Sequence, residues 1–177
     1  MGKIYVVRHG ECIWNVEDKI TGITDVALTE KGIEQAKENA RVITESGIRP
    51  DLIIHSPLSR AAFTAQCIAE AINVPMKMDE RLHERDFGVL EGAPRKCTEY
   101  RSTNTQFANR YETGESLFTV AARVYALLDE LKAAGGDYML VAHTGVCRVV
   151  RTYFEDMTNE EFANMLIPNC GMLTFEF

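Results

Sequence analysis

Short apolar runs alternate with helix-type patterns along nearly the whole chain, and this alternation strongly limits the fold. Runs that favour buried strands occupy residues 3–7, 51–55, 74–78, 138–142 and 172–177. Between them, apolar residues recur at intervals of three and four, as on one face of a helix, within 29–46, 56–72, 116–134 and 145–154. Alternating strands and helices favour a parallel sheet covered by helices. The sequence therefore predicts a three-layer α/β/α sandwich with a mainly parallel central sheet.

Capping signals mark the ends of several predicted helices. Thr29 is a suitable N-cap for the helix over 29–46, and Gly47 is a suitable stop. The pair Thr158 and Glu161 has the spacing of a capping box and predicts a short helix near the chain end. Residues 82–113 are polar and irregular, so only some helix is expected there.

Length and composition exclude several classes of protein. A chain of 177 residues predicts a single domain over 1–177. Its net charge of −7 disfavours nucleic acid and anionic membranes as partners. No apolar run approaches the roughly 20 residues of a membrane span, and we expect no secretion signal. The five cysteines form no CxxC pair, which favours reduced thiols and a cytoplasmic location. The sequence leaves open whether the protein forms a homodimer.

Two histidines directly follow predicted strands. Arg8-His9-Gly10-Glu11 follows the first strand, and His143-Thr144-Gly145 follows the run over 138–142. Ligands of open α/β sheets bind outside the carboxyl ends of strands. Arginine binds phosphate with two donors, and histidine can act as an acid, a base or a nucleophile. Taken alone, the first motif is explained slightly better as a turn with a solvated arginine and a capping histidine.

Two further segments carry charged residues in places that suit chemistry. Arg60 lies in the first turn of the predicted helix that starts near Ser56, where a bound anion would offset its conflict with the helix dipole. Glu84 lies among apolar residues, and a half-buried carboxyl can donate a proton. The alternatives are a surface arginine beside an ordinary cap, and a surface salt bridge from Glu84 to Arg81 or Arg85.

Together these segments resemble the histidine phosphatase superfamily, which includes the cofactor-dependent phosphoglycerate mutases. The resemblance runs from residue 4 to 177. It rests on the ordered blocks Val7-Arg8-His9-Gly10-Glu11, Trp14-Asn15, Thr21-Gly22, Asp25, Leu28-Thr29-Glu30-Lys31-Gly32, Gln35-Ala36, Ser56-Pro57-Leu58-Ser59-Arg60-Ala61, Thr64-Ala65, Leu82-His83-Glu84, Phe87-Gly88, Glu91-Gly92, Gly114-Glu115-Ser116 and Val141-Ala142-His143-Thr144-Gly145-Val146.

The resemblance implies a role for each matching residue. His9 would be the nucleophile that forms a phosphohistidine, and Glu84 the general acid. A backbone carbonyl is expected to accept a hydrogen bond from the other ring nitrogen of His9 and so fix its tautomer. Arg8, Arg60 and His143 would cradle the phosphoryl oxygens. The remaining substrate-binding candidates are Asn15, Thr21, Gly22, Arg95, Thr144 and Gly145, with Glu115-Ser116 near the site. No metal and no cofactor is expected.

The activity implied is that of a histidine acid phosphatase-type phosphoric monoester hydrolase acting on a small phosphorylated metabolite. The alternatives are a cofactor-dependent phosphoglycerate mutase, a regulatory phosphate-binding domain and a phosphoprotein phosphatase. Residues 8–15 and Arg95, at a position where the mutases place a lysine, resemble the mutases. Against a mutase, the segment over 93–114 is short and lacks an Arg-Arg pair, Phe87 replaces a tyrosine, and no asparagine follows His143-Thr144-Gly145.

Two features leave further alternatives. A small cap insertion is predicted at about 93–115, whose Arg95, Lys96, Arg101 and Arg110 either bind a second anionic group of the substrate or belong to a solvated basic loop. Cys12 replaces the Thr or Ser usual in the family. It is either a thiol whose oxidation or alkylation inhibits the enzyme or, as we favour, a small buried hydrophobe. The same two alternatives, a reactive thiol or a small buried hydrophobe, apply to Cys147.

Overall fold

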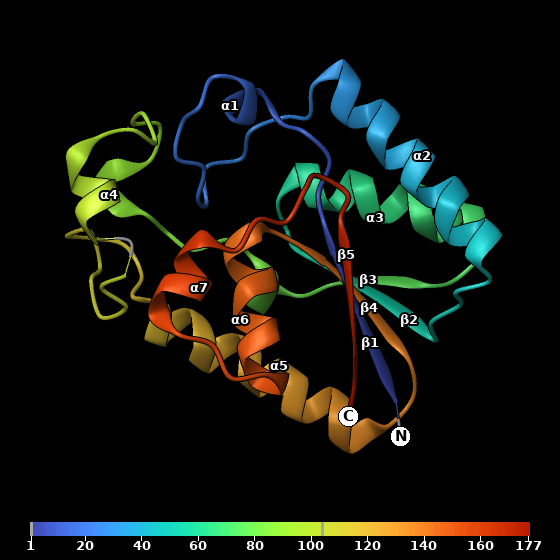
Figure 1. Ribbon diagram of the computed structural model, residues 1–177. Helices are drawn as coiled ribbons and strands as arrows, with labels where there is room; N and C mark the ends of the chain where they lie inside the picture. Colours follow the sequence, from blue (N-terminus) through green and yellow to red (C-terminus); the bar gives the residue numbers. More distant parts are fainter. Residues whose placement is uncertain (1, 104) are drawn as a thin grey trace.

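A twisted five-stranded sheet forms the centre of the computed structural model, which describes residues 2–103 and 105–177 (Figure 1). The strands are β1 (Lys3–Arg8), β2 (Leu52–His55), β3 (Met76–Met78), β4 (Tyr138–Ala142) and β5 (Met172–Glu176). They lie in the order β3-β2-β4-β1-β5. β5 runs antiparallel to β1, and the other neighbours are parallel. The predicted mainly parallel sheet is confirmed.

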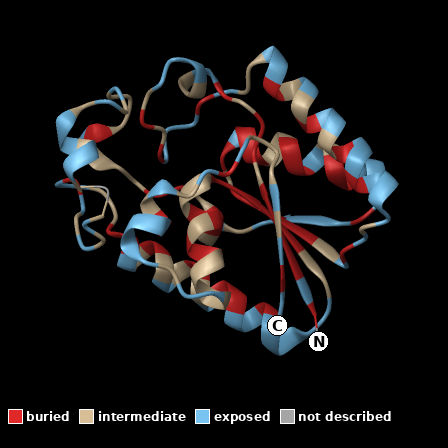
Figure 2. Cartoon of the chain, viewed as in Figure 1, coloured by how far each residue is buried: buried red, intermediate tan, exposed pale blue. Residues whose placement is uncertain are grey.

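Helices cover both faces of the sheet, which confirms the three-layer sandwich. One face of β1 packs Tyr5 and Val7 with apolar residues of α2 (Glu30–Ser46) and α3 (Ser59–Ile72). The opposite face packs Ile4 and Val6 with α5 (Leu117–Ala134) and α6 (Thr144–Phe154). The alternation follows from the two-residue period of a strand, and Figure 2 shows the buried residues on the inner sides of these helices. No helix in the described part of the chain is long and apolar enough to cross a bilayer.

The predicted caps are present. Thr29 accepts a hydrogen bond from the amide of Gly32 at 2.9 Å, and Gly47 ends α2 with φ 72°. Thr158 and Glu161 form the predicted capping box of α7 (Asn159–Asn164). The polar stretch after β3 contains the 3₁₀ turns η1 (Glu80–Leu82) and η2 (Gly88–Leu90) and the helix α4 (Thr98–Thr103). Helix α1 (Ile13–Val16) was not predicted, because this single turn has no buried residue and therefore no apolar pattern.

The carboxyl ends of β1, β2 and β4 meet at one edge of the sheet. Arg8 is in register with Ala142, and His55 with Val141, so the segments that follow these strands emerge side by side. The segment just before β5 packs against the segment that follows β1. The amide of Arg8 donates to the carbonyl of Gly171 at 3.0 Å, and the Asn169 side chain donates to the carbonyl of His9 at 3.1 Å.

Candidate active site

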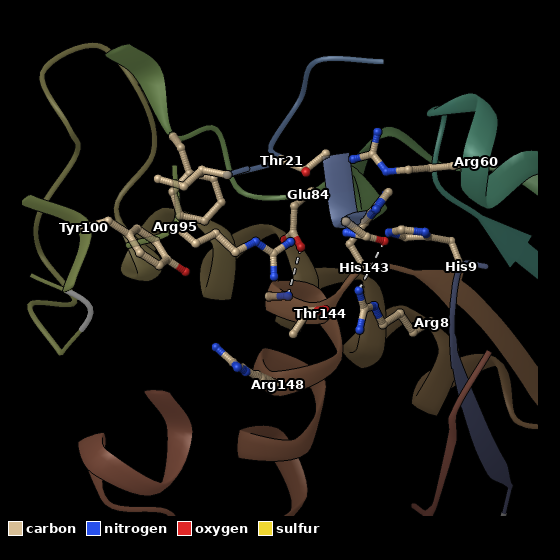
Figure 3. Close-up of a pocket in the computed structure, with 14 residues that line it drawn as sticks. Arg8, His9, Thr21, Arg60, Glu84, Arg95, Tyr100, His143, Thr144 and Arg148 are labelled. Atoms are coloured by element: carbon tan, nitrogen blue, oxygen red, sulfur yellow. Dashed lines mark hydrogen bonds between the residues drawn. The ribbon is translucent and has the colours of Figure 1, made fainter. Parts of the chain in front are cut away.

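A cavity of about 100 Å³ opens at this edge of the sheet, which is room for several water molecules. Figure 3 shows its lining side chains converging from the strand ends, α3, α6 and the loops between them. Its lining includes ten of the predicted site residues: Arg8, His9, Asn15, Thr21, Arg60, Glu84, Arg95, His143, Thr144 and Gly145. Gly22 is the predicted site residue that does not line it. Ile20, Phe87, Tyr100 and Arg148 line it as well.

His9 is held as a neutral imidazole with one free nitrogen. Its Nδ1 lies 2.6 Å from the carbonyl oxygen of Gly10. Because a carbonyl can only accept, Nδ1 must donate, which leaves the lone pair on Nε2. Burial, followed by the charges of Arg60 and Arg8, holds the pKa of His9 well below its usual range. The expected carbonyl acceptor is therefore confirmed, and the ring has the state that a nucleophile needs.

The half-buried guanidinium of Arg8 and the buried guanidinium of Arg60 border His9. Arg8 donates from Nη1 to the carbonyl of Ile167 at 2.5 Å, and Arg60 donates to the carbonyls of Thr24 and Gly22 at 2.9 and 2.8 Å. In both side chains Nε is buried and has no partner among the described residues. Burial lowers the pKa of both groups. A buried cation bonded only to carbonyls needs an anion, and two such cations make this cavity an anion-binding site.

His143 faces the same space from the end of β4. Its ring centroid lies 5.1 Å from that of His9, and its Nε2 lies 2.7 Å from the hydroxyl of Ser56. Its Nδ1 is buried without a partner in the described part of the chain. Burial, with the charge of Arg60 next, holds the pKa of His143 well below its usual range. The Ser56 hydroxyl can donate to Nε2 or accept from it; in the tautomer in which Ser56 donates, Nδ1 carries the hydrogen and is a further donor for an anion.

The carboxyl of Glu84 lies at the wall of the cavity and is held by backbone amides. Its oxygens accept hydrogen bonds from the amides of Arg85 at 2.8 Å and of Gly145 at 3.0 Å. A side chain at position 145 would place Cβ 2.4 Å from Oε1 of Glu84, so it would displace the Glu84 carboxyl from this position. The alternative of a surface salt bridge is wrong. Arg81 pairs with Asp79 and Glu130, and the guanidinium of Arg85 donates to backbone carbonyls.

The loop that carries Glu84 is fixed from behind by an ion pair between Arg123 and Glu115. Arg123 donates to both carboxylate oxygens of Glu115, at 3.0 and 2.9 Å. It also donates to the carbonyls of Arg81 at 2.5 Å and Glu84 at 3.2 Å. Glu115 accepts from the amide of Asp86 at 3.2 Å. Glu115 therefore lies behind the loop that carries Glu84, and its contacts support that loop rather than the cavity.

Replacing Arg123 with methionine is expected to lower the free energy of unfolding by about 2–3 kcal/mol, because the variant leaves the carboxylate of Glu115 half-buried and unpaired. Urea denaturation measures this change. Arg41→Met is the matched control, since Arg41 forms its ion pairs in solvent, and its midpoint is expected to stay near that of the wild type. Equal midpoints for the two variants would contradict the role of the Arg123 pair.

Asn15, Thr21 and Gly22 contribute in different ways. The Asn15 side-chain oxygen accepts from the Cys12 amide at 3.1 Å and from the Asn169 side chain at 3.2 Å, and it lies 3.5 Å from Nη2 of Arg8. Thr21 donates to the carbonyl of Lys19 at 3.3 Å. Gly22 acts through its carbonyl, which holds Arg60. A direct contact of Gly22 with substrate was expected, but Gly22 instead acts indirectly, by positioning Arg60.

Of the four basic residues in the predicted cap, Arg95 is the one that lines the cavity. It donates from Nε to the carbonyl of Lys19 at 3.0 Å. Lys96 lies 3.6 Å from Asp18 in solvent, and Arg101 and Arg110 do not line the cavity. Lys96, Arg101 and Arg110 therefore fit the second of the two predicted alternatives, a solvated basic loop. The cap itself stays a prediction.

Arg148 is a charged lining residue that was not predicted from the sequence. Arg148 lies one helical turn after Thr144 in α6, and residues four apart share a helix face. The four-residue spacing from Thr144 was the sequence signal that could have identified Arg148 as a lining residue. Its guanidinium donates from Nε and Nη2 to the carbonyl of Met165 at 3.0 and 2.6 Å. Tyr100 lies in α4, where the sequence shows no apolar period. Arg148 adds a fourth arginine to a cavity whose described lining holds a single carboxylate, that of Glu84.

Cys12 and Cys147 are both fully buried. Burial raises the pKa of the Cys147 thiol to about 12, so its reactive thiolate form is suppressed. Cys12 serves as the N-cap of α1. Both positions favour the alternative of small buried hydrophobes.

The depressed pKa values of His9 and His143 predict an acid-sensitive fold. In the unfolded chain both rings take up a proton below about pH 6.5, whereas the folded protein keeps them neutral. The unfolded state therefore binds more protons, and stability falls as the pH drops through this value. Between pH 7.5 and pH 5.5 the free energy of unfolding is expected to fall by about 2–3 kcal/mol. Urea denaturation at the two pH values measures it, and an unchanged value would contradict the prediction.

Fold and cavity together define a class: an α/β protein with an anion-binding site at the carboxyl ends of its strands. The binding groups are arginines and neutral imidazoles. Within residues 2–103 and 105–177, no three His, Cys, Asp or Glu side chains are placed to share a metal ion. The family model of the histidine phosphatase superfamily (branch 1) matches residues 4–177. The chain belongs to that superfamily.

Named relatives include both mutases and phosphatases. A 2,3-bisphosphoglycerate-dependent phosphoglycerate mutase of Bacteroides fragilis is 29% identical, over 100% of this chain and 87% of its own length. Phosphoserine phosphatase of Entamoeba histolytica, solved with 3-phosphoglyceric acid, is 30% identical with a TM-score of 0.84 over 100% of this chain and 91% of its own. A mycobacterial glucosyl-3-phosphoglycerate phosphatase is 25% identical with a TM-score of 0.86 over 97% of this chain and 88% of its own.

Proposed function

We propose that the protein is a phosphomonoesterase, of the histidine acid phosphatase type, that hydrolyses a small phosphorylated metabolite through a phosphohistidine at His9. One observation carries the proposal. Around a neutral His9 whose Nε2 is free, three buried nitrogens lack partners in the described chain: Nε of Arg8, Nε of Arg60 and Nδ1 of His143. A phosphoryl group has three oxygens that need such donors during transfer.

The reaction follows from this arrangement in two steps. Nε2 of His9 attacks phosphorus, the P–N bond forms, and the bond to the leaving oxygen breaks while Glu84 gives that oxygen a proton. Water then attacks the phosphohistidine and loses a proton to Glu84, and the P–N bond breaks to release phosphate. Arg8, Arg60 and His143 hold the charge on the equatorial oxygens in both steps.

The substrate carries a second anionic group, in this proposal a carboxylate. Arg95 and Arg148 line the cavity in addition to the two arginines beside His9, and a lone phosphoryl group leaves them without an anion. The structural relatives support the same conclusion, because the compounds they act on or were solved with, phosphoserine, 3-phosphoglyceric acid and glucosyl-3-phosphoglycerate, all carry a carboxylate.

The second candidate is a phosphoglycerate mutase, favoured by the names of the sequence relatives. A mutase must return the phosphoryl group to an acid before water reaches it. The alignment to the Bacteroides fragilis mutase spans 217 positions although this chain has 177 residues, so that mutase contains segments that are absent here. Less protein to cover the phosphohistidine favours hydrolysis. A cytoplasmic location, a homodimer and the absence of nucleic-acid and membrane partners stay predictions.

Phosphate release in the presence of EDTA tests the proposal. The substrates are p-nitrophenyl phosphate, sugar phosphates, nucleotides, phosphoserine and 3-phosphoglycerate, the last with and without 2,3-bisphosphoglycerate. Release with EDTA present, fastest on a carboxylate-bearing ester, is the expected result. Isomerisation of 3-phosphoglycerate without release would establish the mutase. Inactivity on every compound would favour a regulatory phosphate-binding domain or a protein substrate.

A further inference from the structure

A second cavity, here called the side cavity, lies next to the catalytic cavity on the side where Glu84 is held. Its lining comprises Arg85, Phe87, Tyr100, Tyr111, Leu117, Gly145, Arg148, Phe162 and Ala163. Phe87, Tyr100, Gly145 and Arg148 line both cavities. The amide of Gly145 binds Oε2 of Glu84 at 3.0 Å, so the wall shared by the two cavities lies beside the proposed general acid. The leaving group, whose oxygen Glu84 protonates, is therefore the part of the substrate that faces the side cavity.

Arg85 gives the side cavity a buried positive charge. The residue is 4% exposed, and its guanidinium donates to two carbonyls, those of Glu115 at 2.9 Å and Asn109 at 2.6 Å. It stacks on the ring of Tyr111, with 4.6 Å between its Cζ and the ring centroid. Within the described chain it has no ion-pair partner, because Glu115 pairs with Arg123. A buried guanidinium without a carboxylate is a strong reason to expect an anion.

Tyr111 and Arg148 add donors to the same space. Tyr111 is 2% exposed, and its hydroxyl has no hydrogen-bond partner among the described residues. Buried tyrosine hydroxyls usually have one. Arg148 uses two of its nitrogens on the single carbonyl of Met165, which leaves Nη1 without a bond in the described chain. An acceptor entering from the catalytic cavity would satisfy both groups.

We infer that the side cavity binds the carboxylate of the substrate's leaving group, with Tyr111, Arg148 and Arg85 as its donors. The inference rests on the proposed function, because it places the leaving group beside Glu84. The size of the space favours a carboxylate over a second phosphate. The side cavity has a volume of about 40 Å³, against about 100 Å³ for the catalytic cavity.

Calorimetric titration of the His9→Ala variant tests the inference without turnover. The ligands are 3-phosphoglycerate and glycerol 3-phosphate, a pair in which a carboxylate is replaced by a hydroxymethyl group. We expect 3-phosphoglycerate to bind at least about 10-fold more tightly. Adding Tyr111→Phe removes one hydroxyl, and is expected to weaken 3-phosphoglycerate about 10-fold while leaving glycerol 3-phosphate unchanged. Tyr125→Phe is the matched control, since the Tyr125 hydroxyl bonds to Thr152 away from both cavities.

The outcomes separate this inference from the proposed function. Equal affinities for the two ligands would overturn it, as would a Tyr111→Phe effect that is the same for both. If Tyr111→Phe does not fold, Arg148→Gln provides the same comparison, with a selective loss expected for 3-phosphoglycerate. The proposed function is tested separately by wild-type hydrolysis of p-nitrophenyl phosphate, which has no carboxylate. A protein that shows the binding preference but no hydrolysis would keep the side-cavity site and lose the phosphatase.

Discussion

Replacing His9 with alanine is expected to lower phosphate release by about 10⁵-fold or more, because the first bond to phosphorus is then never made. Few side chains can substitute for it. The neighbouring His143 has its Nε2 bonded to Ser56, and Arg8 and Arg60 are not nucleophiles. The variant keeps the buried donors of both arginines, so inorganic phosphate is expected to bind it still.

Two measurements check this prediction. Brief mixing with a ³²P-labelled substrate, followed by denaturation, is expected to leave an acid-labile label on the wild type and none on His9→Ala. Thermal denaturation and phosphate titration of the variant serve as the control for folding. A variant that retains substantial release, or a wild type whose label survives acid, would rule out a phosphohistidine at this position.

Replacing Glu84 with glutamine has the second largest expected effect, and it depends on the leaving group. The amide cannot give a proton to the leaving oxygen. We expect a loss of about 10²–10⁴-fold on an alkyl ester such as 3-phosphoglycerate. On p-nitrophenyl phosphate the loss is expected to be much smaller, because p-nitrophenolate leaves without a proton.

The ratio of the two losses is the measurement, since an unfolded or misplaced site would slow both substrates together. Glu34→Gln is the matched control, because Glu34 is exposed on α2. Its activity on both esters is expected to equal that of the wild type. Equal losses for Glu84→Gln on the two esters would contradict its role as the general acid.

The sheet and the strand-end residues were predictable because local patterns dictate them. The apolar runs of β1, β2 and β4 each end at a polar residue, and parallel pairing places those ends at one edge. His9, Arg60 and His143 follow from that rule and from the family resemblance.

The wall of the site formed by residues 82–103, 105–115 and α7 was not predictable in the same way. Loop residues follow no hydrophobic period, so their sequence does not indicate which side chains face inward. Arg95 lines the cavity while Lys96 lies in solvent, and the sequence offers no means of separating the two. The side cavity depends on long-range packing of Tyr111 and Phe162 around Arg85, which emerges only in three dimensions.

The segment before β5 ties the order of synthesis to the appearance of the reactive group. His9 precedes Asn169 by 160 residues and is therefore translated well before it, yet its loop is held by Asn169 and Gly171, and Ile167 accepts from Arg8. A nascent chain that has emerged only as far as α6 therefore contains the nucleophile without the contacts that orient it. The exposed early chain should thus be chemically inert toward cellular phosphate esters, and reactivity should arise only as the final strand docks.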